Sequence, residues 1–150
     1  MIILSKLADY GVIVASHLAA DQERQMTAAA LATEARLPRA TVAKVLKALA
    51  HAGVVAGARG AAGGYRLARP ATEISVAEVV AAIDGAIGLT QCTTHTPSCE
   101  RSDFCPTRLP WQRINHAVAA ALGAMSLAEM VPPPGNASRP PAALRETLRP

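Results

Sequence analysis

Residues 27–67 read TAAALATEARLPRATVAKVLKALAHAGVVAGARGAAGGYRL, and this stretch decides the fold. Thr27 is a good N-cap for a short first helix. Pro38 opens a second helix, since proline is tolerated in a first turn, and Gly53 supplies its stop. Two helices joined by the brief turn at residues 35–37 predict a helix-turn-helix. The second helix has an apolar stripe for packing, which consists of Val42, Val45, Leu46 and Leu49.

A glycine-rich hairpin follows the two helices. Residues 54–56 and 65–67 are short β-type runs on either side of the loop at residues 57–64. Their spacing predicts a hairpin with an extended tip. A helix-turn-helix followed by such a hairpin is the layout of a winged helix. We therefore expect a mainly α fold, a winged helix-turn-helix with a β-hairpin wing.

Two further helices flank this unit. Residues 5–20 carry apolar side chains at helical spacing, and Ser5 is placed to cap their start. Ser75 and Glu78 form a capping box at the start of another helix, which Gly85 ends. Both helices are expected to belong to the winged-helix unit.

A long helix is predicted in the C-terminal part. Its apolar positions lie three and four residues apart and form a narrow seam, made of Trp111, Ile114, Val118, Leu122 and Met125. A narrow seam on a long helix favours a dimerisation helix over a buried core helix. Ser126 and Glu129 form a second capping box and predict a short final helix.

The expected organisation therefore has four parts. Residues 1–85 are expected to form the winged helix-turn-helix domain, and residues 86–106 are expected to form a loop that contains all three cysteines. Residues 107–131 form the dimerisation helix and the short final helix. Residues 132–150 are rich in proline and are predicted to be disordered.

Basic residues concentrate in the predicted winged helix. The chain has 15 Lys and Arg against 11 Asp and Glu, a net charge of +4, yet residues 35–72 carry seven basic residues and no acidic one. A helix with cations and small residues on one face suits the major groove of DNA, and a long cation at a wing tip suits a minor groove or a phosphate. The alternative is a solvated cationic face without a partner. The candidate DNA-binding residues are Arg39, Ala40, Thr41, Lys44, Lys47 and Arg59.

Composition and motifs exclude other classes of protein. A chain of 150 residues fits one domain with a short appendage, and no apolar run approaches the ~20 residues of a membrane span. Lys6 and Asp9 interrupt the apolar N-terminal stretch, which does not resemble a signal peptide, so a cytoplasmic protein is expected. The glycines of residues 60–64 lack the strand-then-helix context of a dinucleotide site, and we find no nucleophile–base arrangement. An enzyme is not expected.

Three cysteines, Cys92, Cys99 and Cys105, lie in one polar loop. An odd number of cysteines is no disulfide framework, whereas thiolates bind soft and borderline metals. An inorganic core such as an iron–sulfur cluster is one interpretation. Two alternatives stay open: a structural zinc site of the three cysteines and His95, and a metal-free thiol switch at Cys105. Cys105 precedes Pro106 and is predicted at the N-terminus of the long helix, where the helix dipole favours an anionic group.

The chain resembles the Rrf2 family of winged-helix transcriptional regulators in five segments. These are SKLADYG (residues 5–11), TVAKVLKALAHAGVV (41–55), ARGAAGGYRLARP (58–70), ISVAEVVAAIDG (74–85), and the cysteine loop followed by W-x-R-I-N (111–115). Within the family the chain is IscR/NsrR-like and is most similar to regulators of SUF-type iron–sulfur assembly genes. The resemblance implies a homodimer on pseudo-palindromic double-stranded DNA and a [2Fe–2S] or [4Fe–4S] cluster that controls binding.

The resemblance also bears on the fourth cluster ligand. IscR-type proteins place a histidine three residues after the last cysteine, where this chain has Arg108, and a guanidinium cannot ligate iron. NsrR-type proteins use an aspartate of the first helix of the partner subunit, and Asp9 stands at the matching position. The resemblance therefore implies ligation by the three cysteines and by Asp9 of the partner subunit. His95 is the fallback ligand, followed by His116 and Asp103.

Taken together, the residues and the resemblance predict an iron–sulfur-dependent DNA-binding repressor of SUF-type genes, without membrane partners. A nitric-oxide or redox sensor of the same family and a zinc-stabilised winged-helix protein are the alternative functions.

Overall fold

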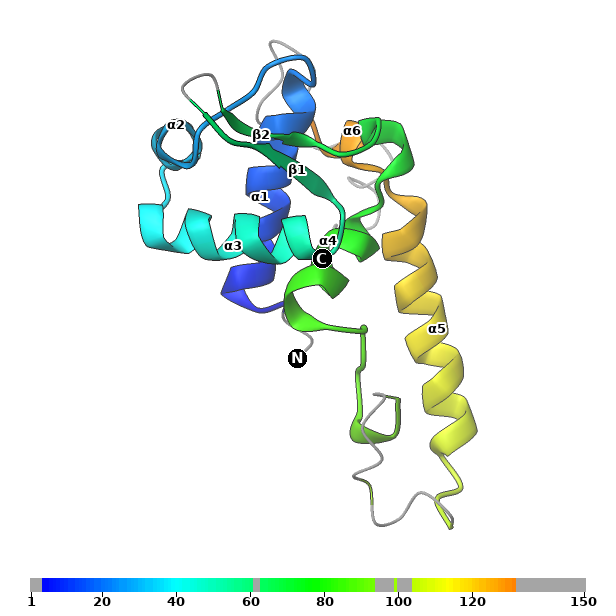
Figure 1. Ribbon diagram of the computed structural model, residues 1–150. Coiled ribbons are helices and arrows are strands. Elements are labelled where there is room, and N and C mark those ends of the chain that lie inside the picture. The colour runs from blue at the N-terminus through cyan, green and yellow to red at the C-terminus, as the bar shows by residue number, and fades with distance from the viewer. Residues whose placement is uncertain (1–3, 61–62, 94–98, 100–103, 132–150) are drawn as a thin grey trace, which may run out of the picture.

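The computed structural model describes residues 4–60, 63–93, 99 and 104–131. Most of these residues are helical, and two strands form a hairpin (Figure 1). The elements in chain order are α1 (Lys6–Ala20), α2 (Ala28–Glu34), α3 (Arg39–His51), β1 (Val55–Ala58), β2 (Gly64–Leu67), the 3₁₀ turn η1 (Ala71–Glu73), α4 (Val76–Asp84), the 3₁₀ turn η2 (Gln91–Thr93), α5 (Arg108–Ala124) and α6 (Leu127–Met130). The predicted winged helix-turn-helix is confirmed.

The helix-turn-helix is built from local signals. The Thr27 hydroxyl accepts a hydrogen bond from the backbone N–H of Ala30 at 3.1 Å and so caps α2. Pro38 is the N-cap of α3, one position earlier than the first-turn position that the sequence predicted. Arg36, in the turn between the helices, has φ +54°, a left-handed conformation that costs a residue with a Cβ roughly 1–2 kcal/mol. Gly53 lies two residues after the end of α3 and has φ +73°, a left-handed conformation that glycine commonly adopts after a helix.

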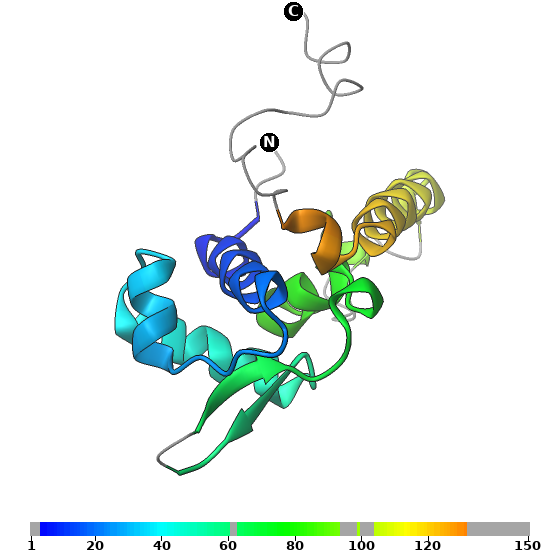
Figure 2. The ribbon, with the colours of Figure 1, turned by 90° about the horizontal axis from the view of Figure 1, so that it is seen from above.

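The hairpin is joined to the chain segment before α2. Strands β1 and β2 are antiparallel, with Val55 opposite Leu67 and Ala58 opposite Gly64. Met26 adds one rung on the other side of β2, because its N–H donates to the Tyr65 carbonyl at 3.0 Å and its carbonyl accepts from Tyr65 N–H at 2.8 Å. The hairpin extends beyond the helical body (Figure 2). The Met26 rung joins β2, one residue from its tip-side end at Gly64, to the segment that precedes α2.

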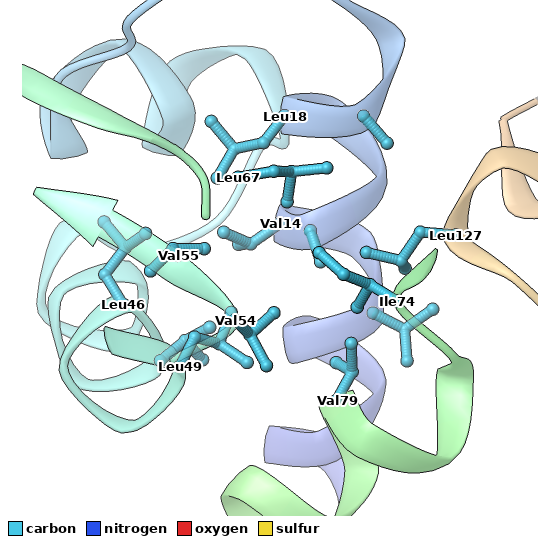
Figure 3. Packing of buried hydrophobic residues seen from close by; sticks show 14 of the residues in the cluster. Val14, Leu18, Leu46, Leu49, Val54, Val55, Leu67, Ile74, Val79 and Leu127 are labelled. Atoms are coloured by element: carbon cyan, nitrogen blue, oxygen red, sulfur yellow. The ribbon is translucent and has the colours of Figure 1, made fainter. Parts of the chain in front are cut away.

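One apolar core lies between α1, α3, α4 and the hairpin (Figure 3). Each element contributes its apolar stripe, and α1 crosses the centre with α3 on one side and α4 on the other. Full burial of a large aliphatic side chain contributes about 1.5–3 kcal/mol to folding, so these contacts dominate the stability of the domain. The largest fully buried side chains are Leu18, Leu31, Leu46, Leu49, Ile74, Leu127, Val14, Val42, Val45, Val54 and Val79.

The capping box of α4 is formed as the sequence predicted. The Ser75 hydroxyl accepts from Glu78 N–H at 3.2 Å, and the Glu78 carboxylate accepts from Ser75 N–H at 3.1 Å. Glu78 also forms an ion pair with Arg69. Partial burial raises the pKa of the Glu78 carboxyl, but the hydrogen bond from Ser75 N–H and the Arg69 guanidinium outweigh it, so the pKa lies below its ordinary value.

This lowered pKa makes part of the stability dependent on pH. Because the Glu78 pKa is lower in the folded chain, its contribution is present above the unfolded pKa of about 4.3 and is lost as the pH falls through the folded value. We expect Glu78→Gln to lower the free energy of unfolding at neutral pH and to have no effect in strong acid. Urea titrations across this range measure the difference. Glu23→Gln, at an exposed position, is the matched control; an effect of Glu78→Gln that persisted unchanged in acid would contradict the prediction.

The long C-terminal helix is present, with bounds that differ from those expected. Helix α5 begins at Arg108, three residues after Cys105, so Cys105 lies before the helix and not at its first turn. Met125, the last position of the predicted seam, caps the C-terminus of α5 outside the helix. The second capping box is confirmed in α6, where the Glu129 carboxylate accepts from Ser126 N–H at 2.8 Å.

Helix α6 returns the chain to the core of the winged helix. Leu127 is completely buried among the residues of that core, and α6 contacts α1 and η1. The backbones of residues 74–76 and 125–127 pair, with Leu127 N–H donating to the Ile74 carbonyl at 2.8 Å and Val76 N–H donating to the Met125 carbonyl at 2.9 Å. The C-terminal end of α5 is thereby attached to the start of α4. The predicted disordered tail, residues 132–150, lies outside the described residues.

Candidate nucleic-acid interface and cysteine site

Helix α3 presents a basic face to solvent. Its apolar stripe is fully buried, and this fixes the rotation of the helix. Among the described residues, neither lysine of α3 has an ion-pair partner. Four predicted DNA-contacting residues of the helix, Arg39, Ala40, Lys44 and Lys47, are exposed, and Thr41 is half-buried. Small residues between the cations leave room for a groove edge to approach the backbone.

The sequence overestimated the basic surface at one position. Arg69 was one of the seven cations counted between residues 35 and 72, but its guanidinium pairs with Glu78 and also donates to the Glu73 carbonyl at 3.2 Å. Arg69 is therefore a structural residue that joins the end of the hairpin to α4. The acidic partner lies beyond the segment that was counted, so charge composition did not reveal it.

The wing adjoins α3 through its first strand. Strand β1 contacts α3, and the hairpin extends beyond the helical body (Figure 2). Arg59, which directly follows β1, is exposed. Two glycines allow the close approach of backbones that this hairpin needs. A Cβ on Gly63 would lie 2.4 Å from the Ala58 carbonyl oxygen, and one on Gly64 would lie 3.0 Å from the Met26 carbonyl carbon. Packing of the wing thus explains the two glycines of the sequence G-G-Y.

We expect Gly63→Ala to weaken DNA binding while the helical core stays folded. The added methyl collides with backbone, which cannot rotate away, so β1 and β2 must separate near the tip. Fluorescence anisotropy with a labelled random-sequence duplex measures affinity, and far-UV circular dichroism reports the helices. Gly123→Ala, in α5 with nothing near the new methyl, is the control. Unchanged affinity in Gly63→Ala would show that wing geometry is not used for binding.

Asp9 is exposed in the first turn of α1. The end of α4 lies beside this turn, since the Ser5 hydroxyl donates to the Asp84 carboxylate at 2.7 Å while also capping α1. Gly11, two residues further, packs so closely on α4 that a Cβ would meet Ile83. Asp9 thus stands on a closely packed helix and is exposed to solvent. Among the described residues it belongs to no group of three or more His, Cys, Asp or Glu side chains that could hold a metal ion.

All three cysteines are half-buried and free of disulfides. The Cys92 sulfur lies 3.2 Å from the Thr90 hydroxyl, and the Cys105 sulfur lies 3.3 Å from the Thr107 hydroxyl. Within the described part of the chain, no three His, Cys, Asp or Glu side chains are close enough to hold a metal ion. The shared cysteine site predicted from the sequence therefore stays a prediction. His95 and Asp103 lie outside the described residues, and His116 is exposed on α5.

The donor set nevertheless fits an iron–sulfur cluster in its chemistry. Three thiols in one loop are the ligands such clusters take from proteins. Hydroxyl groups within hydrogen-bond distance of two of the sulfurs are the kind of partner that stabilises a thiolate and tunes a cluster. Arg108, at the position where the resemblance to IscR-type proteins implies a histidine, has no nitrogen lone pair to offer to a metal.

A residue that the sequence did not single out joins the loop to α5. The Asn115 side chain accepts a hydrogen bond from Leu89 N–H and donates one to the Ile87 carbonyl, both at 3.0 Å. The segment after α4 therefore runs beside α5, as Figure 1 shows. The signal was present, because Asn115 is the last residue of W-x-R-I-N, but the motif does not say which backbone it pairs with.

Helix α5 exposes large apolar side chains away from the core. Leu109 is 68% exposed, Ile114 46% and Trp111 38%. Leu122, further along the helix, packs against the core. The N-terminal half of α5 therefore carries apolar surface that its own chain does not cover within the described residues. None of the helices described combines the length and the apolar character that crossing a membrane requires.

Comparison with known proteins points to one family of transcriptional regulators. Residues 4–133 match a family model described as "Rrf2: Iron-dependent Transcriptional regulator". The chain is 38% identical over 79 residues to the HTH-type transcriptional regulator IscR of Xenorhabdus nematophila, covering 53% of this chain and 48% of that protein. It is 33% identical over 88 residues to protein rrf2 of Nitratidesulfovibrio vulgaris, covering 59% of each. The matches span about half the length of these curated relatives.

Solved structures share the fold. The chain superposes on CymR, described as the global cysteine regulator of B. subtilis, with a TM-score of 0.69 and 24% identity, covering 87% of this chain and 96% of that one. It superposes on T. potens IscR with a TM-score of 0.66 and 25% identity, covering 86% of this chain and 85% of that one.

Proposed function

The chain belongs to the Rrf2 family of transcriptional regulators, and from this premise we propose that it binds double-stranded DNA as a homodimer under the control of an iron–sulfur cluster. Helix α3 enters the major groove, and the β1–β2 wing contacts the adjacent backbone or minor groove. The observation that carries the proposal is the exposed basic face of α3 beside the wing. Among the described residues, the cations of this face form no ion pair.

The dimer forms through α5. Its exposed apolar side chains are the kind that helix pairs bury, and burial of such surface stabilises association. A twofold dimer presents two copies of α3, so its operator is a pseudo-palindrome with half-sites about one DNA turn apart. The spacing of the two recognition helices then decides the affinity.

Cys92, Cys99 and Cys105 hold the cluster, and Asp9 of the partner subunit supplies the fourth ligand. Asp9 suits this role because it is exposed and rigidly placed. The cluster, of [2Fe–2S] or [4Fe–4S] type, supplies redox and ligand-exchange chemistry when bound. The cysteine loop lies between α4 and α5. Helix α4 packs in the winged-helix core, and the end of α5 is attached to the start of α4 by backbone hydrogen bonds. A change in the loop therefore alters how α5 positions the two DNA-binding domains of the dimer. We propose repression of SUF-type assembly genes in the cytoplasm.

The decisive experiment is anaerobic purification followed by an absorbance spectrum and quantification of iron, sulfide and zinc in one sample. We expect a brown protein with iron and sulfide, a cluster lost in Cys99→Ser and weakened in Asp9→Ala, and different affinity for DNA with and without the cluster. Glu34→Ala, a carboxylate on α2 paired with Arg24, is the control for Asp9→Ala.

Three other outcomes would redirect the assignment. One zinc per chain and no iron would identify the Cys₃His structural site with His95. Failure of reconstitution would leave a thiol switch at Cys105 or a metal-free repressor. A cluster that nitric oxide destroys with release of DNA would identify a nitric-oxide sensor.

A further inference from the structure

The Asn115 side chain holds the approach to Cys92. After α4 ends at Asp84, residues 85–90 have no helix or strand of their own, and they lead directly into the turn that contains Cys92. Asn115 pairs with this segment at two points, through Leu89 N–H and the Ile87 carbonyl, each at 3.0 Å. This is the donor–acceptor pattern with which a neighbouring strand would pair, here supplied by a side chain in the middle of α5.

Apolar packing alone does not fix the segment. It lies along a cavity of about 520 Å³ whose walls include Val80 of α4, Ile87 and Leu89 of the segment, and Val118 and Leu122 of α5. Ile87 packs against the core, but the cavity leaves the rest of the segment with less packing around it, so the two directional hydrogen bonds of Asn115 determine its position. The half-buried position of Asn115 strengthens them, because water competes less for the amide.

The same residue stands on the element that leaves the cysteine loop. Asn115 lies seven residues after Arg108, the start of α5, which is roughly 10 Å along a helix. Cys105 precedes that start by three residues, and its carbonyl accepts a hydrogen bond from Arg108 N–H at 3.3 Å. The approach to Cys92 is thus joined to the helix that follows Cys105. The turn that contains Cys92 is stabilised by its own hydrogen bonds. The Thr93 hydroxyl accepts from Thr90 N–H at 3.1 Å and donates to the Thr90 carbonyl at 2.8 Å.

We propose that Asn115 is a positioning residue of the cysteine site, which sets the place of Cys92 relative to Cys105 and couples the loop to α5. It ligates nothing itself. This inference rests on the proposed function in one respect only: the group that the cysteines hold is the cluster proposed above. The placement of Cys92 is a property of the protein without metal and is measured there.

The test uses the full chain and two variants. Asn115→Leu removes both hydrogen bonds, and Asn115→Asp keeps the shape but turns a carboxylate oxygen toward the Ile87 carbonyl. In the metal-free protein we expect both variants to accelerate alkylation of Cys92 by iodoacetamide about tenfold, with Cys105 unchanged. After anaerobic reconstitution, both should bind less iron and lose the visible chromophore faster to a chelator. Gln112→Leu, another amide on α5 that is exposed, is the matched control.

Each outcome decides the proposal. If Cys92 alkylation in both variants equals that of the wild type, the proposal is overturned, whether or not a cluster forms. Wild-type behaviour in Asn115→Asp with a defect in Asn115→Leu would overturn the two-point pairing, since the hydrogen bond to the Ile87 carbonyl would then not be needed. Faster alkylation with unchanged iron content would overturn the role toward the cluster. If the wild type binds no iron but both variants expose Cys92, the proposed function fails and the positioning role stands. Far-UV circular dichroism confirms that each variant is folded.

Discussion

Replacing Lys44 and Lys47 together by alanine is expected to weaken DNA binding by about 100-fold or more at moderate salt, since each lysine contact to a phosphate or guanine contributes about 1–3 kcal/mol. Both side chains are exposed on α3, opposite the buried apolar stripe, and neither has an ion pair among the described residues, so their charges are available to DNA. Fluorescence anisotropy with a random-sequence duplex measures the non-specific part of this affinity.

The salt dependence separates the two roles of a lysine. If both residues contact phosphates, the slope of log affinity against log salt falls by about two in the double variant. A lysine that reads a base edge lowers affinity mainly for selected operators. Lys6→Ala, which removes one exposed cation from α1, is the control. Equal loss in Lys6→Ala and in either single variant would show that net charge, and not the α3 face, binds DNA.

Leu127→Ala is expected to destabilise the whole winged helix by about 3 kcal/mol, although Leu127 lies on a helix of only four residues at the end of the described chain. The side chain is completely buried among core residues from α1 and α4, and its backbone N–H donates to the Ile74 carbonyl. Truncation leaves a cavity that backbone pairing around Ser75 and Ser126 prevents from closing. Urea unfolding followed by circular dichroism measures the change.

The control for this substitution is another leucine of the same region. Leu109 on α5 is 68% exposed, so Leu109→Ala should alter the free energy of unfolding of the monomer by less than about 0.5 kcal/mol. Equal effects of the two substitutions would mean that α6 does not belong to the core. Operator binding should fall in Leu127→Ala only as far as the folded fraction does.

Most of the fold could be predicted from the sequence because its signals are local. The caps at Ser5, Thr27 and Ser75 and the glycines after α3 and α4 act on backbone groups within a few residues, so they are visible in a single stretch of chain. The apolar stripe of α3 likewise fixes its exposed face, which is why the basic face was predicted with the right residues. The predicted bounds of β1 and α5 were less accurate, because where a strand or helix ends depends on contacts with segments that are distant along the chain.

Arg36 shows where a local rule was not enough. A left-handed turn residue is commonly glycine, and the arginine at this position gave no sign of its conformation. The turn is held because Arg36 N–H donates to the Thr33 carbonyl at 3.3 Å and Leu37 N–H donates to the Ala32 carbonyl at 2.9 Å. Packing of α2 against α3 imposes the turn and the residue adapts to it.

The sequence by itself determined the winged helix, the basic face of α3 and the three-cysteine loop, because periodicity, capping and residue type are properties of short segments. Only the tertiary structure decided that Arg69 is paired with Glu78, that Met26 extends the hairpin, that Leu127 completes the core and that Asn115 holds the approach to Cys92. These contacts join elements separated along the chain, and their partners are selected by which surfaces the buried apolar core brings face to face.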